Sequence, residues 1–63
     1  MGFFTSAKDL QKWVRAHGSA EEAALNILGV TGRDKEQDIV QTCNRIFEEG
    51  DENAAEILFI KVK

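Results

Sequence analysis

The 63-residue sequence contains no proline and no tyrosine, and it has only one cysteine, one histidine and one tryptophan. A single cysteine excludes an internal disulfide and suits a reducing compartment. The chain does not open with a charged region followed by an apolar one, and no apolar run approaches the roughly 20 residues of a membrane span. We therefore expect a soluble cytoplasmic protein that has no contact with a membrane.

The sequence also has too few reactive side chains for the common catalytic or metal sites. One histidine and one cysteine leave zinc short of ligands, and neither a calcium loop nor a glycine-rich phosphate loop is present. His17 and Cys43 both fall on apolar helical stripes, which favours a helix-capping histidine and a core cysteine over a base and a nucleophile. The sequence predicts no catalytic residues, no metal, no cofactor and no small-molecule substrate, and a protein that is not an enzyme.

The absence of proline leaves long helices possible, and residues 34–50 carry the strongest helical pattern. Ile39, Cys43, Ile46 and Gly50 recur at spacings of four, three and four, which is typical of one helix face turned toward a core. Acidic side chains crowd the first turns, where the helix dipole favours them, and Gly50 supplies a stop. The rest of the chain is expected to cover this stripe.

Capping signals divide the remaining sequence into shorter helices. Ser6 and Ser19 each precede an acidic residue at the spacing of a capping box, and Asn53 has the same relation to Glu56. The glycines after residue 28 predict a turn, from which Val30 is expected to fill the core. The sequence predicts one all-α domain, 1–63, a small bundle of four short helices packed as two helical hairpins. These helices are expected at 6–17, 20–28, 34–49 and 53–60.

The last residues allow two interpretations. Residues 58–63 alternate apolar and basic side chains as a strand would, but they also continue a helical stripe, and so short a run does not settle the choice. A strand would need a partner, either residues 2–4 or a second copy of the chain. The C-terminal residues are therefore expected to be helical or extended.

The small size of the chain favours a role in binding other proteins. A domain of about 60 residues buries only about 60% of its unfolded surface, and this chain has no disulfide or metal to reinforce its core. Apolar side chains near both termini would form an interface if they do not bury each other. We expect a non-catalytic protein-interaction module or small regulatory subunit, with a homodimer as one form of that interaction. The candidate partner-binding residues are Phe3, Phe4, Phe59, Ile60 and Val62.

The alternative is a compact helix-turn-helix protein that binds DNA. The 20–28 helix, the glycine turn and the 34–49 helix resemble that motif in order and size. In this interpretation one group of residues would contact phosphates at the start of the second helix, and another would face base edges. The first group is Thr31, Arg33 and Lys35, and the second is Gln37, Gln41, Asn44 and Arg45.

The distribution of charge counts against nucleic acid. Residues 1–33 hold four basic and three acidic side chains, a net charge of +1, whereas residues 34–60 hold two basic and eight acidic ones, a net charge of −6. With the two C-terminal lysines the small acidic protein has a net charge of −3. A field of that sign repels a phosphate backbone. Binding to DNA is therefore the less favoured function.

Overall fold

The computed structural model describes residues 4–62, and these residues form four α-helices without a strand. The helices are α1 (Ala7–Arg15), α2 (Ala20–Thr31), α3 (Glu36–Glu49) and α4 (Glu52–Val62). The predicted all-α fold of four short helices is thus confirmed. None of the four described helices combines the length and the apolar content needed to cross a bilayer.

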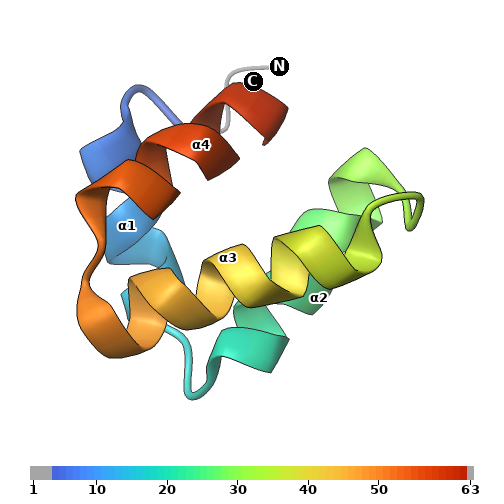
Figure 1. The fold of residues 1–63 in the computed structure, drawn as a ribbon, viewed down its shortest axis with the longest axis horizontal. Coiled ribbons are helices and arrows are strands. Elements are labelled where there is room, and N and C mark those ends of the chain that lie inside the picture. Colours follow the sequence, from blue (N-terminus) through green and yellow to red (C-terminus); the bar gives the residue numbers. More distant parts are fainter. Residues whose placement is uncertain (1–3, 63) are drawn as a thin grey trace.

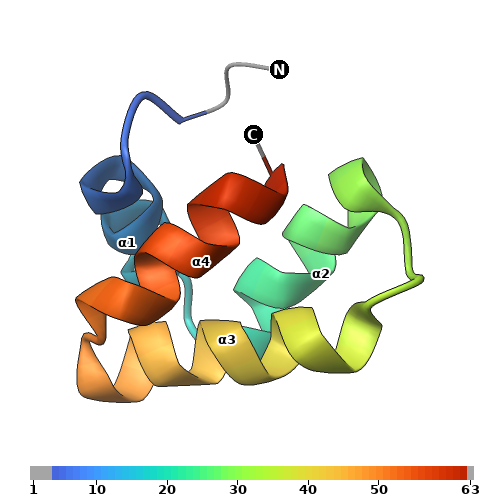
Figure 2. The same cartoon turned by 45° about the horizontal axis from the view of Figure 1, so that its top comes forward.

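Helix α3 organises the packing, because the other three helices all lie against it (Figure 1). In Figure 2 α3 forms the base of the molecule, and α1, α4 and α2 lie above it. The hairpin of α3 and α4 packs closely, whereas α1 touches α2 at few residues and packs mainly on α4. The pair α1–α2 is therefore splayed apart, whereas the pair α3–α4 is in close contact.

The core contains the side chains that the helical spacing selected. Leu10 and Val14 of α1, Cys43 and Ile46 of α3, and Leu58 of α4 are all fully buried. Alanines of α2 and α4 are buried beside them, which lets the helix backbones approach closely. Cys43 is confirmed as a core residue.

Two of the predicted helix starts are confirmed by their hydrogen bonds. The backbone N–H of Asp9 donates to Ser6 Oγ at 3.3 Å, and that of Glu22 donates to Ser19 Oγ at the same distance. Each serine thereby satisfies one of the unpaired donors in the first turn of its helix.

The predicted cap of the last helix is wrong. Asp51, not Asn53, caps α4: its Oδ1 accepts from the backbone N–H groups of Asn53 (2.9 Å) and Ala54 (3.3 Å). A carboxylate is favoured at this position because it is negatively charged and faces the positive end of the helix dipole. The helix consequently begins at Glu52.

The predicted end of the second helix is also wrong, because α2 continues through Gly29 to Thr31. A glycine inside a helix costs only about 1 kcal/mol, so it does not by itself end one. The helix ends instead at Gly32, whose φ of 87° no right-handed helix contains. Val30 therefore lies on the surface of α2, 44% exposed, and does not fill the core from a turn.

Helices α1 and α3 are shorter than expected. α1 ends at Arg15, two residues before the predicted end, and α3 begins at Glu36, two residues after the predicted start. Lys35 precedes α3 without a side-chain hydrogen bond to its first turn. The acidic residues at 34–38 therefore predicted the start of α3 to within two residues.

The C-terminal residues are helical through Val62, so an extended end is excluded up to that residue. Leu58 and Val62, which are one helical turn apart, are both buried, as the helical alternative requires. A strand would have turned Ile60 to the same side as Leu58, yet Ile60 is 71% exposed. Packing on the core therefore selected the helix where sequence alternation was ambiguous.

Two glycines are expected to respond oppositely to alanine. Gly50 ends α3 in the left-handed region, with φ 65° and ψ 32°, and its N–H donates to the Ile46 carbonyl at 3.1 Å. An L side chain in that conformation costs roughly 1–2 kcal/mol, so Gly50→Ala should destabilise the protein by about that amount. Gly29→Ala should stabilise it by roughly 0.5–1 kcal/mol, because Gly29 is helical and no atom lies near its added Cβ. Urea denaturation of both variants measures the difference, and shifts of the same sign would contradict these two roles.

Candidate functional site

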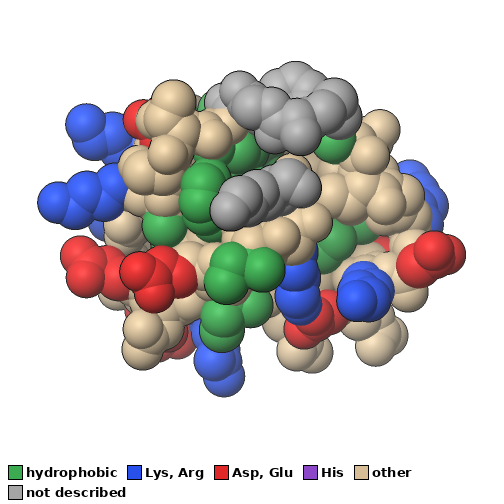
Figure 3. Space-filling model, turned by 90° about the horizontal axis from the view of Figure 1, so that it is seen from above, with side chains coloured by type: hydrophobic (Ala, Val, Ile, Leu, Met, Phe, Trp, Pro, Cys, Tyr) green, Lys and Arg blue, Asp and Glu red, His purple; other side chains and the backbone are tan. Residues whose placement is uncertain are grey.

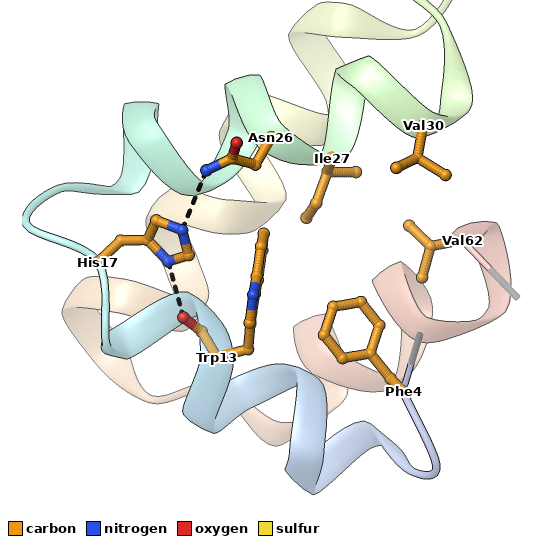
Figure 4. Close-up of a pocket in the computed structure, with 7 residues that line it drawn as sticks. All are labelled: Phe4, Trp13, His17, Asn26, Ile27, Val30 and Val62. Atoms are coloured by element: carbon orange, nitrogen blue, oxygen red, sulfur yellow. Dashed lines mark hydrogen bonds between the residues drawn. The ribbon is translucent and has the colours of Figure 1, made fainter. Parts of the chain in front are cut away.

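A cleft of about 400 Å³ lies between the N-terminal segment, α1, α2 and the end of α4 (Figure 4). It occupies the place where α1 and α2 make few contacts. We call it the Trp13 cleft, after the one tryptophan of the chain. Its lining residues are Phe4, Trp13, His17, Asn26, Ile27, Val30 and Val62.

Three aromatic rings form one side of the Trp13 cleft. The ring centroids of Phe4 and Trp13 are 5.3 Å apart at an interplanar angle of 69°, and those of Trp13 and His17 are 4.3 Å apart at 66°. Edge-to-face pairs of this kind are stabilising, so the indole is held on two sides. The cleft therefore has a preformed aromatic wall.

Two polar side chains close one end of the cleft. His17 Nδ1 lies 2.8 Å from the carbonyl oxygen of Trp13, and His17 Nε2 lies 3.1 Å from Asn26 Nδ2 (Figure 4). A carbonyl oxygen can only accept, so Nδ1 donates to Trp13, and the Asn26 amide lies within hydrogen-bonding distance of Nε2. His17 thus caps a carbonyl at the end of α1, as the sequence predicted, and also links α1 to α2.

The helical spacing of the chain places these side chains on facing surfaces. Trp13 lies in the last turn of α1 and His17 two residues after the helix ends, and Asn26 and Val30 are one turn apart on α2. Ile27 is buried at 3% exposure, whereas Val30 is open to solvent at 44%. The cleft is thus lined by apolar side chains from its interior to its rim, with His17 and Asn26 at one end and the indole of Trp13 between.

Of the five predicted partner-binding residues, the structure brings two together in this cleft. Phe4 and Val62 both line it. Phe59 is half-buried and packs against the core, and Ile60 is exposed on α4 outside the cleft lining. Phe3 lies outside the described residues. A role in binding stays a prediction for all five.

Sequence reasoning did not identify Trp13, Ile27, Val30 or the His17–Asn26 pair as a site. The available signal was Trp13, a large aromatic at the border of the apolar stripe of α1 rather than at its centre. Such a border position leaves part of the ring accessible, and Trp13 is indeed half-buried. The contributions from α2 and α4 depend on how the helices pack.

All seven residues proposed for DNA binding are exposed. Acidic side chains, however, lie beside the basic ones among these residues. Arg33 Nη1 lies 3.5 Å from Glu36 Oε1, and Asp34 and Asp38 line the same surface depression as Arg33 and Lys35. Carboxylates therefore lie where this hypothesis requires phosphates.

Cys43 is separate from the Trp13 cleft. Its side chain is fully buried in the core, and desolvation raises the pKa of its thiol from 9.0 to about 11. A thiol in such surroundings stays protonated and is a poor nucleophile. His17 is engaged with Trp13 and Asn26. The arrangement thus gives no Cys43–His17 catalytic pair.

Comparisons of the chain with protein-family models, with curated proteins and with solved structures found no match. The functional interpretation accordingly depends on the geometry and the residue chemistry of the cleft.

Proposed function

We propose that this protein is a non-catalytic protein-interaction module and that the Trp13 cleft receives an apolar side chain of its partner. The observation that carries the proposal is a preformed apolar cleft, open to solvent and built around a fixed tryptophan. Tryptophan is among the residues that contribute most to binding energy at protein interfaces. A preformed cleft also reduces the entropy lost when a partner binds.

The polar groups of the cleft support binding of an apolar group. His17 and Asn26 satisfy each other, and among the described residues no buried side-chain nitrogen or oxygen lacks a hydrogen-bond partner. An incoming apolar side chain can therefore cover the contact between His17 and Asn26 without breaking it, while the indole N–H of Trp13 is a donor that a partner carbonyl can accept from. Burial of apolar surface contributes about 25 cal/mol of free energy per Å². One large side chain buried in the cleft therefore contributes part of the binding free energy that a micromolar dissociation constant requires.

The chemistry of the cleft favours a side chain over a small metabolite. Its volume lies at the lower end of the range of small-molecule sites, but such sites usually offer several converging polar groups. Among the described residues that line the cleft there is no Asp, Glu, Lys or Arg, and the imidazole and the amide are paired with each other. A Leu, Ile, Met or Phe side chain from a partner fits these walls.

Substitution at the rim of the cleft should weaken partner binding. Peptides that bind the wild-type protein can be selected from a phage-displayed random library and their affinities measured by fluorescence anisotropy. Val30→Gln should weaken binding about tenfold, equivalent to about 1.4 kcal/mol, because it places an amide at the apolar rim. Leu25→Gln is the matched control: it lies on the same helix, is 56% exposed and does not line the cleft.

The selection has two outcomes that contradict the proposal. One is that no peptide is enriched on the folded wild-type protein. The other is that Val30→Gln and Leu25→Gln change the affinity equally for every selected peptide. Circular dichroism of both variants ensures that a lost fold is not counted as lost binding.

DNA binding remains a second candidate because of one observation. Gln37, Gln41, Asn44 and Arg45 are all exposed on α3, at spacings that place them along one side of the helix. If this side reads DNA, Arg45→Ala should weaken binding to duplex DNA at low salt. We expect no saturable binding to mixed duplex DNA, and a saturable affinity that Arg45→Ala lowers would favour this candidate.

A further inference from the structure

Two isoleucines are exposed on α4 without a partner in the described chain. Ile57 is 51% exposed and Ile60 is 71% exposed, and they are neighbours at a spacing of three residues on the outer side of the helix. Figure 3 looks onto the molecule from the side on which α4 lies, and hydrophobic side chains are visible there between charged ones. The core does not use these two side chains, since other residues of α4 fill it.

A groove between α3 and α4 adjoins this pair. Its volume is about 280 Å³, and Ile57 forms part of its wall. The remaining lining residues are mostly polar: Asp38, Gln41, Thr42, Arg45, Asp51, Asn53 and Ala54. The groove therefore combines an apolar edge with groups that can bind a charged or polar partner.

The charge of this half of the molecule is strongly negative. Residues 34–62 hold eight acidic and three basic side chains, a net charge of −5, whereas residues 4–33 hold three acidic and four basic ones, a net charge of +1. Of the three basic residues, Lys61 forms an ion pair with Asp38 and Arg45 lines the groove. On α4 itself, Glu56 is one turn before Ile60, and Glu52 is one turn before Glu56.

We propose that the outer face of α4, defined by Glu52, Glu56, Ile57 and Ile60, together with the adjoining groove, binds a basic amphipathic helix of another protein. Apolar side chains of that helix cover the two isoleucines, and its lysines or arginines lie against the carboxylates of α4 and Asp51. Charge complementarity of this kind speeds association and selects partners. The mode is that of an amphipathic helix laid on an apolar surface.

The sign of the charge selects this occupant over the alternatives. A second copy that seats its own α4 on this face would bring together two surfaces from the half of the chain whose net charge is −5, and charges of like sign oppose such a contact. Nucleic acid and anionic lipid are repelled by the same carboxylates. Because no residue of the α4 face lines the Trp13 cleft, this surface goes beyond the proposed function and allows two partners at once.

The test uses two synthetic 14-residue helical peptides, one of leucine and lysine and one with glutamate in place of lysine. The Leu-Lys peptide should bind the wild-type protein, and the Ile57→Ser/Ile60→Ser double variant should bind it at least about tenfold more weakly. Leu25→Ser, which removes an exposed leucine of α2, should leave the affinity unchanged. The affinity should fall as salt is raised, because screening weakens attraction between exposed charges.

Backbone amide NMR shifts locate the contact, and Trp13 emission separates it from the cleft. We expect shifts in residues 51–60 with unchanged Trp13 fluorescence. Equal binding of the Leu-Glu peptide, an unchanged affinity in the double variant, or shifts confined to the cleft would each overturn the proposal. Sedimentation that shows a dimer dissolved by Ile57→Ser/Ile60→Ser would also overturn it, since a second copy would then occupy this face.

Discussion

Replacement of Ile46 by alanine is expected to lower the free energy of unfolding by about 2–5 kcal/mol, because it removes buried methylene and methyl groups and leaves a cavity. Ile46 is fully buried on α3, the helix on which the other three pack. A domain of 63 residues has a total stability on the order of 3–9 kcal/mol, so the variant should be close to unfolding at room temperature.

Urea denaturation followed by circular dichroism measures this effect. Ile60→Ala is the matched control, because the same side chain is removed from a position that is 71% exposed. Its unfolding free energy should stay within about 0.5 kcal/mol of wild type, as is usual for surface substitutions. Similar losses in the two variants would mean that α3 does not form the centre of the core.

The thiol of Cys43 is expected to react about a hundredfold more slowly in the native protein than in the unfolded chain at pH 8. Burial raises its pKa from 9.0 to about 11, so the reactive thiolate falls from about one molecule in ten to about one in a thousand. Steric burial slows the reaction further. A disulfide reagent added with and without denaturant measures both rates, and equal rates would place the thiol at the surface.

The same raised pKa makes stability depend on pH. A thiol whose pKa is higher in the folded protein stabilises it fully below the unfolded value of 9.0, and this contribution is lost as pH rises toward about 11. Between these limits the free energy of unfolding should therefore fall with pH. Cys43→Ala should lack this part of the decrease, and the difference between the two pH profiles isolates the contribution of the thiol.

The all-α fold could be predicted because each apolar stripe has helical periodicity and two of its helices begin at well-formed caps. Cys43 and Ile46 lie at spacings that place them on one face of α3, and both are fully buried. Ser6 and Ser19 carry local capping signals that need no tertiary information. These features depend on neighbouring residues only.

The helix ends that were predicted wrongly depend on small free-energy differences between neighbouring candidate positions, and the local sequence does not reveal these differences. Gly29 and Gly32 look alike in the sequence, yet only Gly32 adopts a positive φ. Asp51 and Asn53 are both good caps, and the carboxylate was selected. In each case a difference on the order of 1 kcal/mol between competing positions determined where the helix began or ended.

The Trp13 cleft could be predicted only in part because it joins segments far apart in the chain. Phe4 and Val62 were proposed as partner-binding residues and do line the cleft, but Ile27 and Val30 reach it through the packing of α2. The open contact between α1 and α2, which makes room for the cleft, is a property of the assembled helices. No local pattern encodes it.

Trp13 fluorescence is the most direct test that the cleft is a binding site. Trp13 is the single tryptophan of the chain and lines the cleft, so its emission reports the cleft alone. Titration with a selected peptide should shift its emission to shorter wavelength, with the same dissociation constant that anisotropy gives, because the bound side chain excludes water from the indole. If every selected peptide binds by anisotropy and leaves the Trp13 emission unchanged, partners bind elsewhere and the proposed function is contradicted.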